Sequence, residues 1–182
     1  KSGCYIMEIQ ILHWFETLHN PITNPIFYVI TTLGNAGWIW IVLAVLMLTV
    51  LPKKYKKAGL TMAIALILSL IFCNGIMKHL WARPRAFWVV GQNFVVGNEF
   101  PSGHSSASFA AAVSIFMWRK KEGSAALVLA ALIAFSRLYF TVHYPTDVLV
   151  GTITGALYGV AAYFIVKALI NKVPKLNAIF NK

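Results

Sequence analysis

Two short segments place a histidine beside groups that can bind or orient an anion. His104 ends the tetrapeptide 101–104, Pro-Ser-Gly-His. His143 lies six positions after Arg137 and four positions before Asp147. A histidine can attack phosphorus as a nucleophile, or it can transfer a proton near neutral pH. These residue types, in this arrangement, predict the breaking of a phosphoester or phosphoanhydride bond, and they leave open which histidine attacks.

Basic residues supply the matching positive charge. Lys78, Arg83 and Arg85 precede the tetrapeptide, and Arg137 precedes His143. Such cations bind phosphate oxygens and stabilise the charge that develops in a transition state. For Arg83, extension toward lipid headgroups is an equal alternative.

The tetrapeptide 101–104 resembles the beginning of a helix. Free N–H groups at a helix start favour an anion, and Gly103 allows the backbone to approach it closely. The Ser102 hydroxyl adds a donor. Read alone, the tetrapeptide also fits a simple helix cap.

Asp147 is the natural partner of His143. Pro145 predicts that a helix begins between them, which places Asp147 one turn beyond His143. The carboxylate can then accept a hydrogen bond from a ring nitrogen, fix the tautomer and support positive charge on the ring. Because an ionisable pair is costly near a membrane, a functional pair is favoured over a structural one.

The acidic residues are too few for the usual metal-assisted hydrolysis. The chain has five Asp and Glu residues, of which only Glu99 and Asp147 are near the motifs. Two-metal hydrolysis requires several carboxylates. The sequence therefore predicts no metal ion and no cofactor, and the absence of a glycine-rich nucleotide loop is evidence against a kinase.

The composition is that of an integral membrane protein. Of 182 residues, 59% are hydrophobic and 12% are charged, and the mean hydropathy is +0.71. One domain over 1–182 fits this length. The net charge of +11 comes mostly from short basic clusters, which favours membrane orientation over nucleic-acid binding. The amino-terminal stretch predicts no cleavable signal peptide, because it carries charges and has no small-residue cleavage site.

The apolar segments predict an all-α, polytopic membrane bundle with about five to six spans. Residues 1–20 are expected to form an interfacial amphipathic helix, and residues 81–101 an outer loop. An interruption at 34–37 leaves open whether the first segment kinks, re-enters or crosses. The expected spans are 25–51, 58–80, 101–118, 123–140 and 144–169.

Charge bias predicts the orientation in the cell membrane. The basic clusters at 53–57, at 119–121 and in the tail fall on one face if five spans alternate, and that face is expected to be cytoplasmic. The histidine motifs then fall on the extracytoplasmic face.

Together, the three clusters resemble the type 2 phosphatidic acid phosphatase superfamily, whose relatives include the vanadium haloperoxidases. The family's first motif is a lysine, six residues and Arg-Pro. Lys78 and Arg85 fit it, with Ala86 in place of the usual proline. The second motif matches completely at 101–104, and the third, Ser-Arg, five residues, His, three residues, Asp, matches completely at 136–147. The resemblance covers residues 20–169.

The resemblance implies a role for each matched residue. His143 would be the nucleophile that forms a phosphohistidine, oriented by Asp147. His104 would be the general acid and later the base that activates water. The phosphate would be held by Lys78, Arg85, Ser102, Gly103 and Arg137.

The resemblance also implies a lipid substrate within the bilayer. A lipid mono- or diphosphate is expected, most of all undecaprenyl diphosphate, because this carrier lipid is recycled at the outer face. Phosphatidylglycerophosphate or a broad range of phosphatidates is the alternative. A lipid-binding or transport protein without catalysis is a different class, and phosphate release would distinguish it. The soluble, larger haloperoxidases fit this chain poorly, and the sequence indicates no protein partner.

Overall fold

The computed structural model describes residues 2–81, 100–173 and 180, with residues 2–5 described by their backbone alone. Within these ranges the chain is helical and contains no strand, which confirms the all-α prediction. The helices are α1 (Ser2–Glu16), α2 (Thr23–Leu33), α3 (Trp38–Thr49), α4 (Lys56–Leu68), α5 (Lys78–Leu80), α6 (Gly103–Trp118), α7 (Lys120–Tyr139) and α8 (Pro145–Lys172). A π-helical segment, Ser69–Met77, joins α4 to α5.

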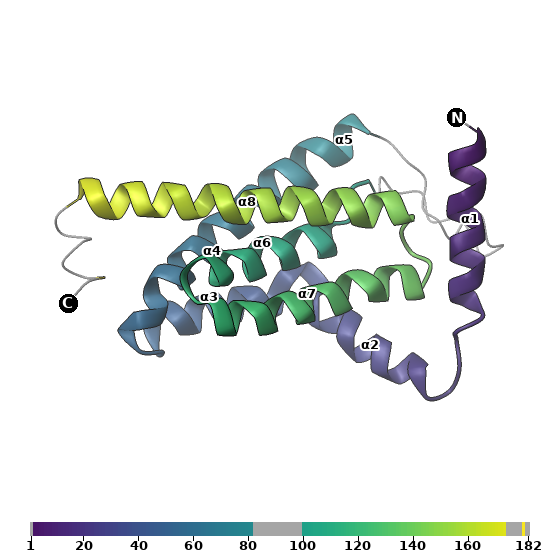
Figure 1. Cartoon of the computed structure of the whole chain (residues 1–182), viewed down its shortest axis with the longest axis horizontal. Coiled ribbons are helices and arrows are strands. Elements are labelled where there is room, and N and C mark those ends of the chain that lie inside the picture. The colour runs from purple at the N-terminus through teal and green to yellow at the C-terminus, as the bar shows by residue number, and fades with distance from the viewer. Residues whose placement is uncertain (1, 82–99, 174–179, 181–182) are drawn as a thin grey trace.

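Three helices are long and apolar enough to cross a membrane, which makes the chain a multi-pass membrane protein (Figure 1). They are Lys53–Leu80, α7 and α8, and the pair Thr23–Leu33 and Asn35–Thr49, bent by 44°, makes a fourth if it counts as one span. The expected count of five to six spans also included α6. With 16 residues, α6 is shorter than the roughly 20 residues that a full crossing requires. The described ranges therefore hold three to four such spans.

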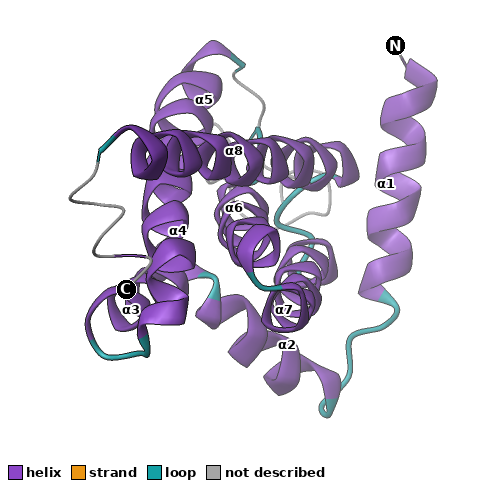
Figure 2. Ribbon diagram, turned by 60° about the vertical axis from the view of Figure 1, so that its left-hand side comes forward, coloured by secondary structure: helices purple, strands orange, loops and turns teal. Residues whose placement is uncertain are grey.

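Helix α6 lies at the centre, between α4, α7 and α8 (Figure 2). It carries several fully buried serines. The hydroxyls of Ser69 and Ser106 are 2.8 Å apart, and the Trp40 indole N–H donates to the Ser108 hydroxyl at 3.0 Å. Because hydrocarbon offers no water to polar groups, such bonds between helices hold the bundle together.

Three glycines on α8 let it lie unusually close to α6. Gly151, Gly155 and Gly159 follow one another at intervals of one turn. A Cβ at Gly151 would lie 2.5 Å from the Ser102 carbonyl oxygen, and one at Gly159 would lie 2.9 Å from the Ala110 carbonyl oxygen. Small residues at helix crossings permit this close approach. The glycines thus bring the start of α8 against the start of α6, where the histidine motifs lie.

Helix α1 lies across the end of the bundle at which α8 begins (Figure 1). The Glu8 carboxylate accepts from the Thr146 backbone N–H at 3.1 Å and from its hydroxyl at 2.5 Å. Leu12 is buried against Tyr144. A carboxylate at the first turn of a helix is stabilised by the free N–H groups there. Residues 1–20 therefore support the turn that carries His143, and their position at the membrane surface stays a prediction.

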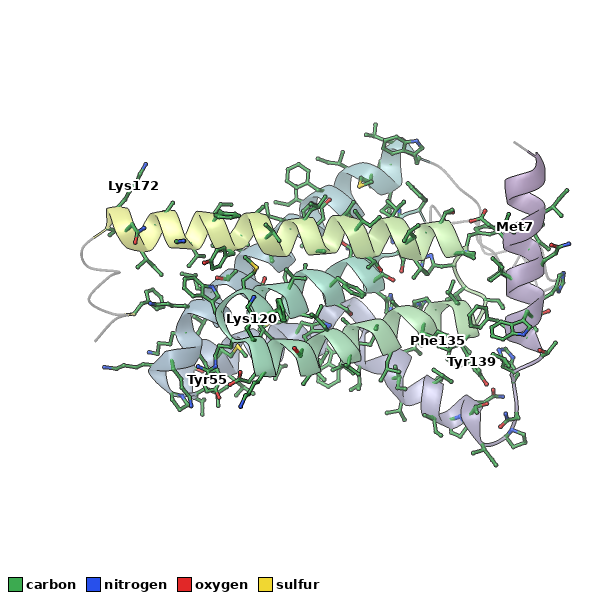
Figure 3. The ribbon with its side chains drawn as sticks, in the orientation of Figure 1. Met7, Tyr55, Lys120, Phe135, Tyr139 and Lys172 are labelled. Atoms are coloured by element: carbon green, nitrogen blue, oxygen red, sulfur yellow. The ribbon has the colours of Figure 1, made fainter. Side chains whose placement is uncertain are left out.

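The described basic residues at 53–57, at 119–121 and at 167–172 lie toward the other end of the bundle. Figure 3 shows Tyr55, Lys120 and Lys172 toward one end, with Met7 and Tyr139 toward the end at which α8 begins. The lysine side chains pack on aromatic rings, as with Lys120 Nζ, 3.9 Å from the Phe116 ring centre. These basic residues and the start of α8, which carries Asp147, lie at opposite ends of the bundle.

Candidate active site

A tight reversal of the chain between α7 and α8 presents His143. The Val142 N–H donates to the Arg137 carbonyl at 3.1 Å and the Thr141 N–H to the Leu138 carbonyl at 2.8 Å. This pair of bonds is the Schellman ending of a helix. It requires a left-handed residue, and Thr141 takes that conformation with φ of 52°, which is uncommon for a β-branched side chain. The reversal carries the chain from the end of α7 directly to His143.

His143 and Asp147 are paired in the interior. His143 is 2% exposed and Asp147 is 0% exposed. His143 Nδ1 lies 3.7 Å from Asp147 Oδ2, a separation of an ion pair rather than of a hydrogen bond. The same Oδ2 accepts from the Tyr144 N–H at 3.0 Å and so caps α8. The structure thus shows the expected proximity of His143 and Asp147. Nδ1 of the ring faces the carboxylate, so Nε2 is the ring nitrogen that faces away from it.

The start of α6 is joined to this pair through the backbone. The Ser102 N–H donates to the Asp147 carbonyl at 3.0 Å. The Ser102 hydroxyl accepts from the Ser105 hydroxyl at 3.1 Å and from the Ser105 N–H at 3.4 Å. The capping interpretation of the tetrapeptide is therefore correct, and it is compatible with an anion at the same helix start. Contact of Ser102 with phosphate stays a prediction.

His104 lies half-buried beside the other positively charged groups. Lys78, Arg137 and His143 all lie within electrostatic range of its ring. Its Nε2 is 2.9 Å from Oδ1 of Asn35. The structure therefore brings the two histidine motifs and Lys78, the described residue of the first motif, into one site.

Arg137 is held by a residue from a distant helix. Its Nη1 donates to the Thr31 hydroxyl at 2.6 Å, and Thr31 is buried on α2. The sequence analysis missed both Thr31 and Asn35. The interruption at 34–37 was the only sign of them in the sequence, and nothing in it identified their partners.

An apolar cavity of about 580 Å³ opens onto the site. Its polar lining is Ser69, Asn74, Lys78 and His104, and it passes between α3, α4 and α6. A Cβ on Gly103 would lie 2.6 Å from Asn74 Oδ1, so a side chain there would displace the amide end of Asn74. The apolar lining includes Ile41, Val45, Leu48, Ala63, Leu66 and Ile67. The cavity thus connects a cationic end to an apolar groove, part of whose lining, including Ile41, Val45 and Ile67, is about half exposed.

Some predicted residues fall outside the described ranges. These are Arg83, Arg85, Ala86 and most of the expected loop 81–101, including Glu99. Phosphate binding by Arg85 stays a prediction. Within the ranges that are described, the structure gathers no three or more His, Cys, Asp or Glu side chains that could hold a metal ion.

A helical membrane bundle with two histidines, an aspartate and cations at one end has the parts of a phosphatase. The sequence profile of the PAP2 superfamily matches residues 54–171. The chain belongs to the PAP2 superfamily, which confirms the resemblance seen in its motifs and the expectation of a membrane phosphatase.

Curated relatives extend this match over most of the chain. The chain is 32% identical over 164 residues to "Putative undecaprenyl-diphosphatase YbjG" of Escherichia coli (strain K12), covering 87% of this chain and 77% of the relative. It is 28% identical over 180 residues to a "Lipid A 4'-phosphatase" of Bacteroides thetaiotaomicron, covering 90% and 78%.

Two solved structures have the same fold. The crystal structure of Aquifex aeolicus LpxE aligns with a TM-score of 0.68 at 22% identity, covering 84% of this chain and 92% of that one. The first transmembrane PAP2 type phosphatidylglycerolphosphate phosphatase from Bacillus subtilis aligns with a TM-score of 0.71 at 23% identity, covering 95% and 89%.

Proposed function

We propose that this PAP2 protein hydrolyses undecaprenyl diphosphate to undecaprenyl phosphate and inorganic phosphate. The observation that carries the proposal is the cavity that joins Lys78 and His104 to an apolar groove open to the surface. A polyprenyl chain in this cavity would hold its phosphates beside both side chains. The undecaprenyl-diphosphatase names of curated relatives support the choice of lipid.

The reaction follows from the positions of the two histidines. Nε2 of His143 attacks the terminal phosphorus, and Asp147 supports the positive charge that forms on the ring. The bond from phosphorus to the bridging oxygen breaks, and His104 gives that oxygen a proton. His104 then takes a proton from water, which attacks the phosphohistidine and releases phosphate.

Positive groups stabilise the charge on the transferring phosphoryl group. Lys78 and Arg137 approach from two helices, and Arg85 is assigned to the same task by the family motif. The N–H groups at the start of α6, with Ser102 and Gly103, add donors that need no rearrangement during the reaction. These cations take the place that metal ions occupy in other phosphatases.

The active site is assigned to the extracytoplasmic face. Supporting this, the start of α8, which carries Asp147, lies at the end of the bundle opposite Lys172 (Figure 3), and basic residues favour the cytoplasmic side. A membrane-impermeant phosphate ester should therefore be hydrolysed by right-side-out vesicles. Hydrolysis that begins only after the vesicles are opened would contradict the assignment.

A phosphate-release panel tests the substrate. Purified protein in mixed micelles is given undecaprenyl diphosphate, phosphatidylglycerophosphate, phosphatidate and lipid A, each with and without a chelator, beside His143→Ala as the inactive control. We expect the highest kcat/KM for undecaprenyl diphosphate, and no change with chelator. A higher value for phosphatidylglycerophosphate or lipid A would transfer the assignment to that lipid. Release from none of them would favour a lipid-binding or transport protein.

A further inference from the structure

The break between α2 and α3 contacts the general acid. Asn35 lies in a short turn, Asn35–Gly37, that separates the two helices. Its Oδ1 is 2.9 Å from Nε2 of His104. A carbonyl oxygen can only accept a hydrogen bond, so in this arrangement Nε2 carries the proton that it donates. Asn35 belongs to none of the three phosphatase motifs.

The same contact sets the direction of the imidazole ring. A Cβ placed on Gly34 would lie 3.0 Å from His104 Cδ2, so the ring edge formed by Cδ2 and Nε2 faces the break. Nδ1 lies on the other side of the ring, away from that edge. Nδ1 is therefore the nitrogen available to exchange a proton with substrate.

The backbone of the break is bent; Gly34 and Gly37 are buried, whereas Asn35 and Ala36 are exposed. Ala36 has φ of 49° and Gly37 has φ of 67°, and the left-handed conformation is unfavourable for a residue other than glycine. A Cβ on Gly34 would also lie 2.6 Å from Ile133 Cγ2 on α7. Strain of this kind persists where the surrounding structure imposes it, often at functional sites.

Thr31 gives an independent reason to regard this segment as part of the site. It lies one turn before Asn35, and its hydroxyl accepts from Arg137 Nη1 at 2.6 Å. The end of α2 and the break therefore contact both a phosphate-binding cation and the general acid, from a part of the chain that precedes the family match at 54–171.

We propose that Asn35 is a positioning residue for His104, a role that rests on the proposed function. In the imidazolium form, Nε2–H donates to Asn35 and Nδ1–H faces the leaving oxygen. When the bond from phosphorus to that oxygen breaks, the Nδ1 proton passes to the oxygen and its electron pair stays on Nδ1. The neutral ring keeps its proton on Nε2, still donated to Asn35. Nδ1 then accepts a proton from the attacking water.

The test compares two leaving groups within each variant. Decyl phosphate releases an alkoxide that needs a proton, whereas 4-nitrophenyl phosphate releases a phenolate that needs little help. Asn35→Leu removes the acceptor while keeping the size of the side chain. With decyl phosphate, we expect the rate of phosphoenzyme formation to fall about tenfold or more. With 4-nitrophenyl phosphate, the same rate, measured as the burst of nitrophenolate, should fall by less than about threefold.

Two further variants separate positioning from damage to the fold. Asn35→Asp keeps an acceptor oxygen and should retain the wild-type ratio between the two substrates. Asn24→Leu is the matched control. Among the side-chain bonds that the structure shows, the Asn24 side chain on α2 accepts only from the Tyr139 hydroxyl, at 2.6 Å. This variant should leave the ratio unchanged.

Three outcomes would overturn the proposal. In Asn35→Leu, the rates with both substrates could fall equally, or neither rate could fall. In Asn35→Asp, the ratio of the two rates could change as much as it does in Asn35→Leu. The ratio does not depend on the fraction of folded protein. Neither substrate carries a polyprenyl chain, so failure of the undecaprenyl assignment would be seen separately, in the lipid panel.

Discussion

The two histidines are held in different ways, although they serve one site. His143 is buried, and the reversal that presents it and its partner Asp147 come from the twelve residues 136–147. His104 is half-buried, and its hydrogen-bond partner Asn35 is 69 positions away in sequence. A nucleophile must meet phosphorus along one line, which suits a rigid local turn. An acid that must also serve as a base exchanges protons with two partners, and its orientation depends here on tertiary structure.

Replacing His143 should have the largest effect. His143→Ala removes the proposed nucleophile, so we expect turnover of both an alkyl and an aryl phosphate to fall by at least about 10⁴-fold. The measurement is steady-state phosphate release, with helix content from circular dichroism as the folding control. A surviving burst of nitrophenolate would show that another group attacks.

Replacing His104 should have a smaller effect that depends on the leaving group. We expect His104→Ala to slow release from decyl phosphate by about 10²- to 10⁴-fold, because a positioned acid contributes that much. The loss in the nitrophenolate burst should be at least about tenfold less, since that leaving group needs no proton. Equal losses with both substrates would remove the distinction between the two histidines.

Replacing Thr31 should have the smallest effect of the three. Thr31→Val keeps the shape but loses the hydroxyl that accepts from Arg137 at 2.6 Å. We expect kcat/KM to fall about tenfold for both leaving groups, because a bond to a charged group is worth roughly 1.5–3 kcal/mol. Thr32→Val is the matched control, as its hydroxyl donates to the Tyr28 carbonyl of the same helix at 2.7 Å. A similar loss in both variants would mean that α2 is merely destabilised.

The part of the site that is local in sequence could be predicted. Asp147 follows His143 by one helical turn, and Pro145 marks where that helix begins, so spacing alone indicated their proximity. The helix start at Ser102-Gly103 was also predicted, with a simple cap as the alternative to anion binding, and the structure shows the Ser102 cap. The helical class also followed from composition, because in hydrocarbon every backbone group must be bonded within a helix or a closed barrel.

The part that depends on tertiary contacts could not be predicted. The contacts of Asn35 with His104 and of Thr31 with Arg137 join helices far apart in the chain, and no periodic pattern marks them. By length and composition, three to four of the described helices could span a membrane, against the expected five to six. Helix α6, one of the expected spans, is a central helix of 16 residues whose buried serines bond to neighbours. Helix α1 was expected at the surface, and the contact between Glu8 and Thr146 had no sequence signal.

The most direct test of the account is to trap the phosphoenzyme and map the phosphorylated residue. The purified protein is mixed with labelled substrate, quenched in base to preserve phosphohistidine, digested and sequenced by mass spectrometry. The account predicts label on His143 in the wild type, label that still accumulates on His143 in His104→Ala with the aryl substrate, and none in His143→Ala. Label on His104, or label that persists in His143→Ala, would contradict it.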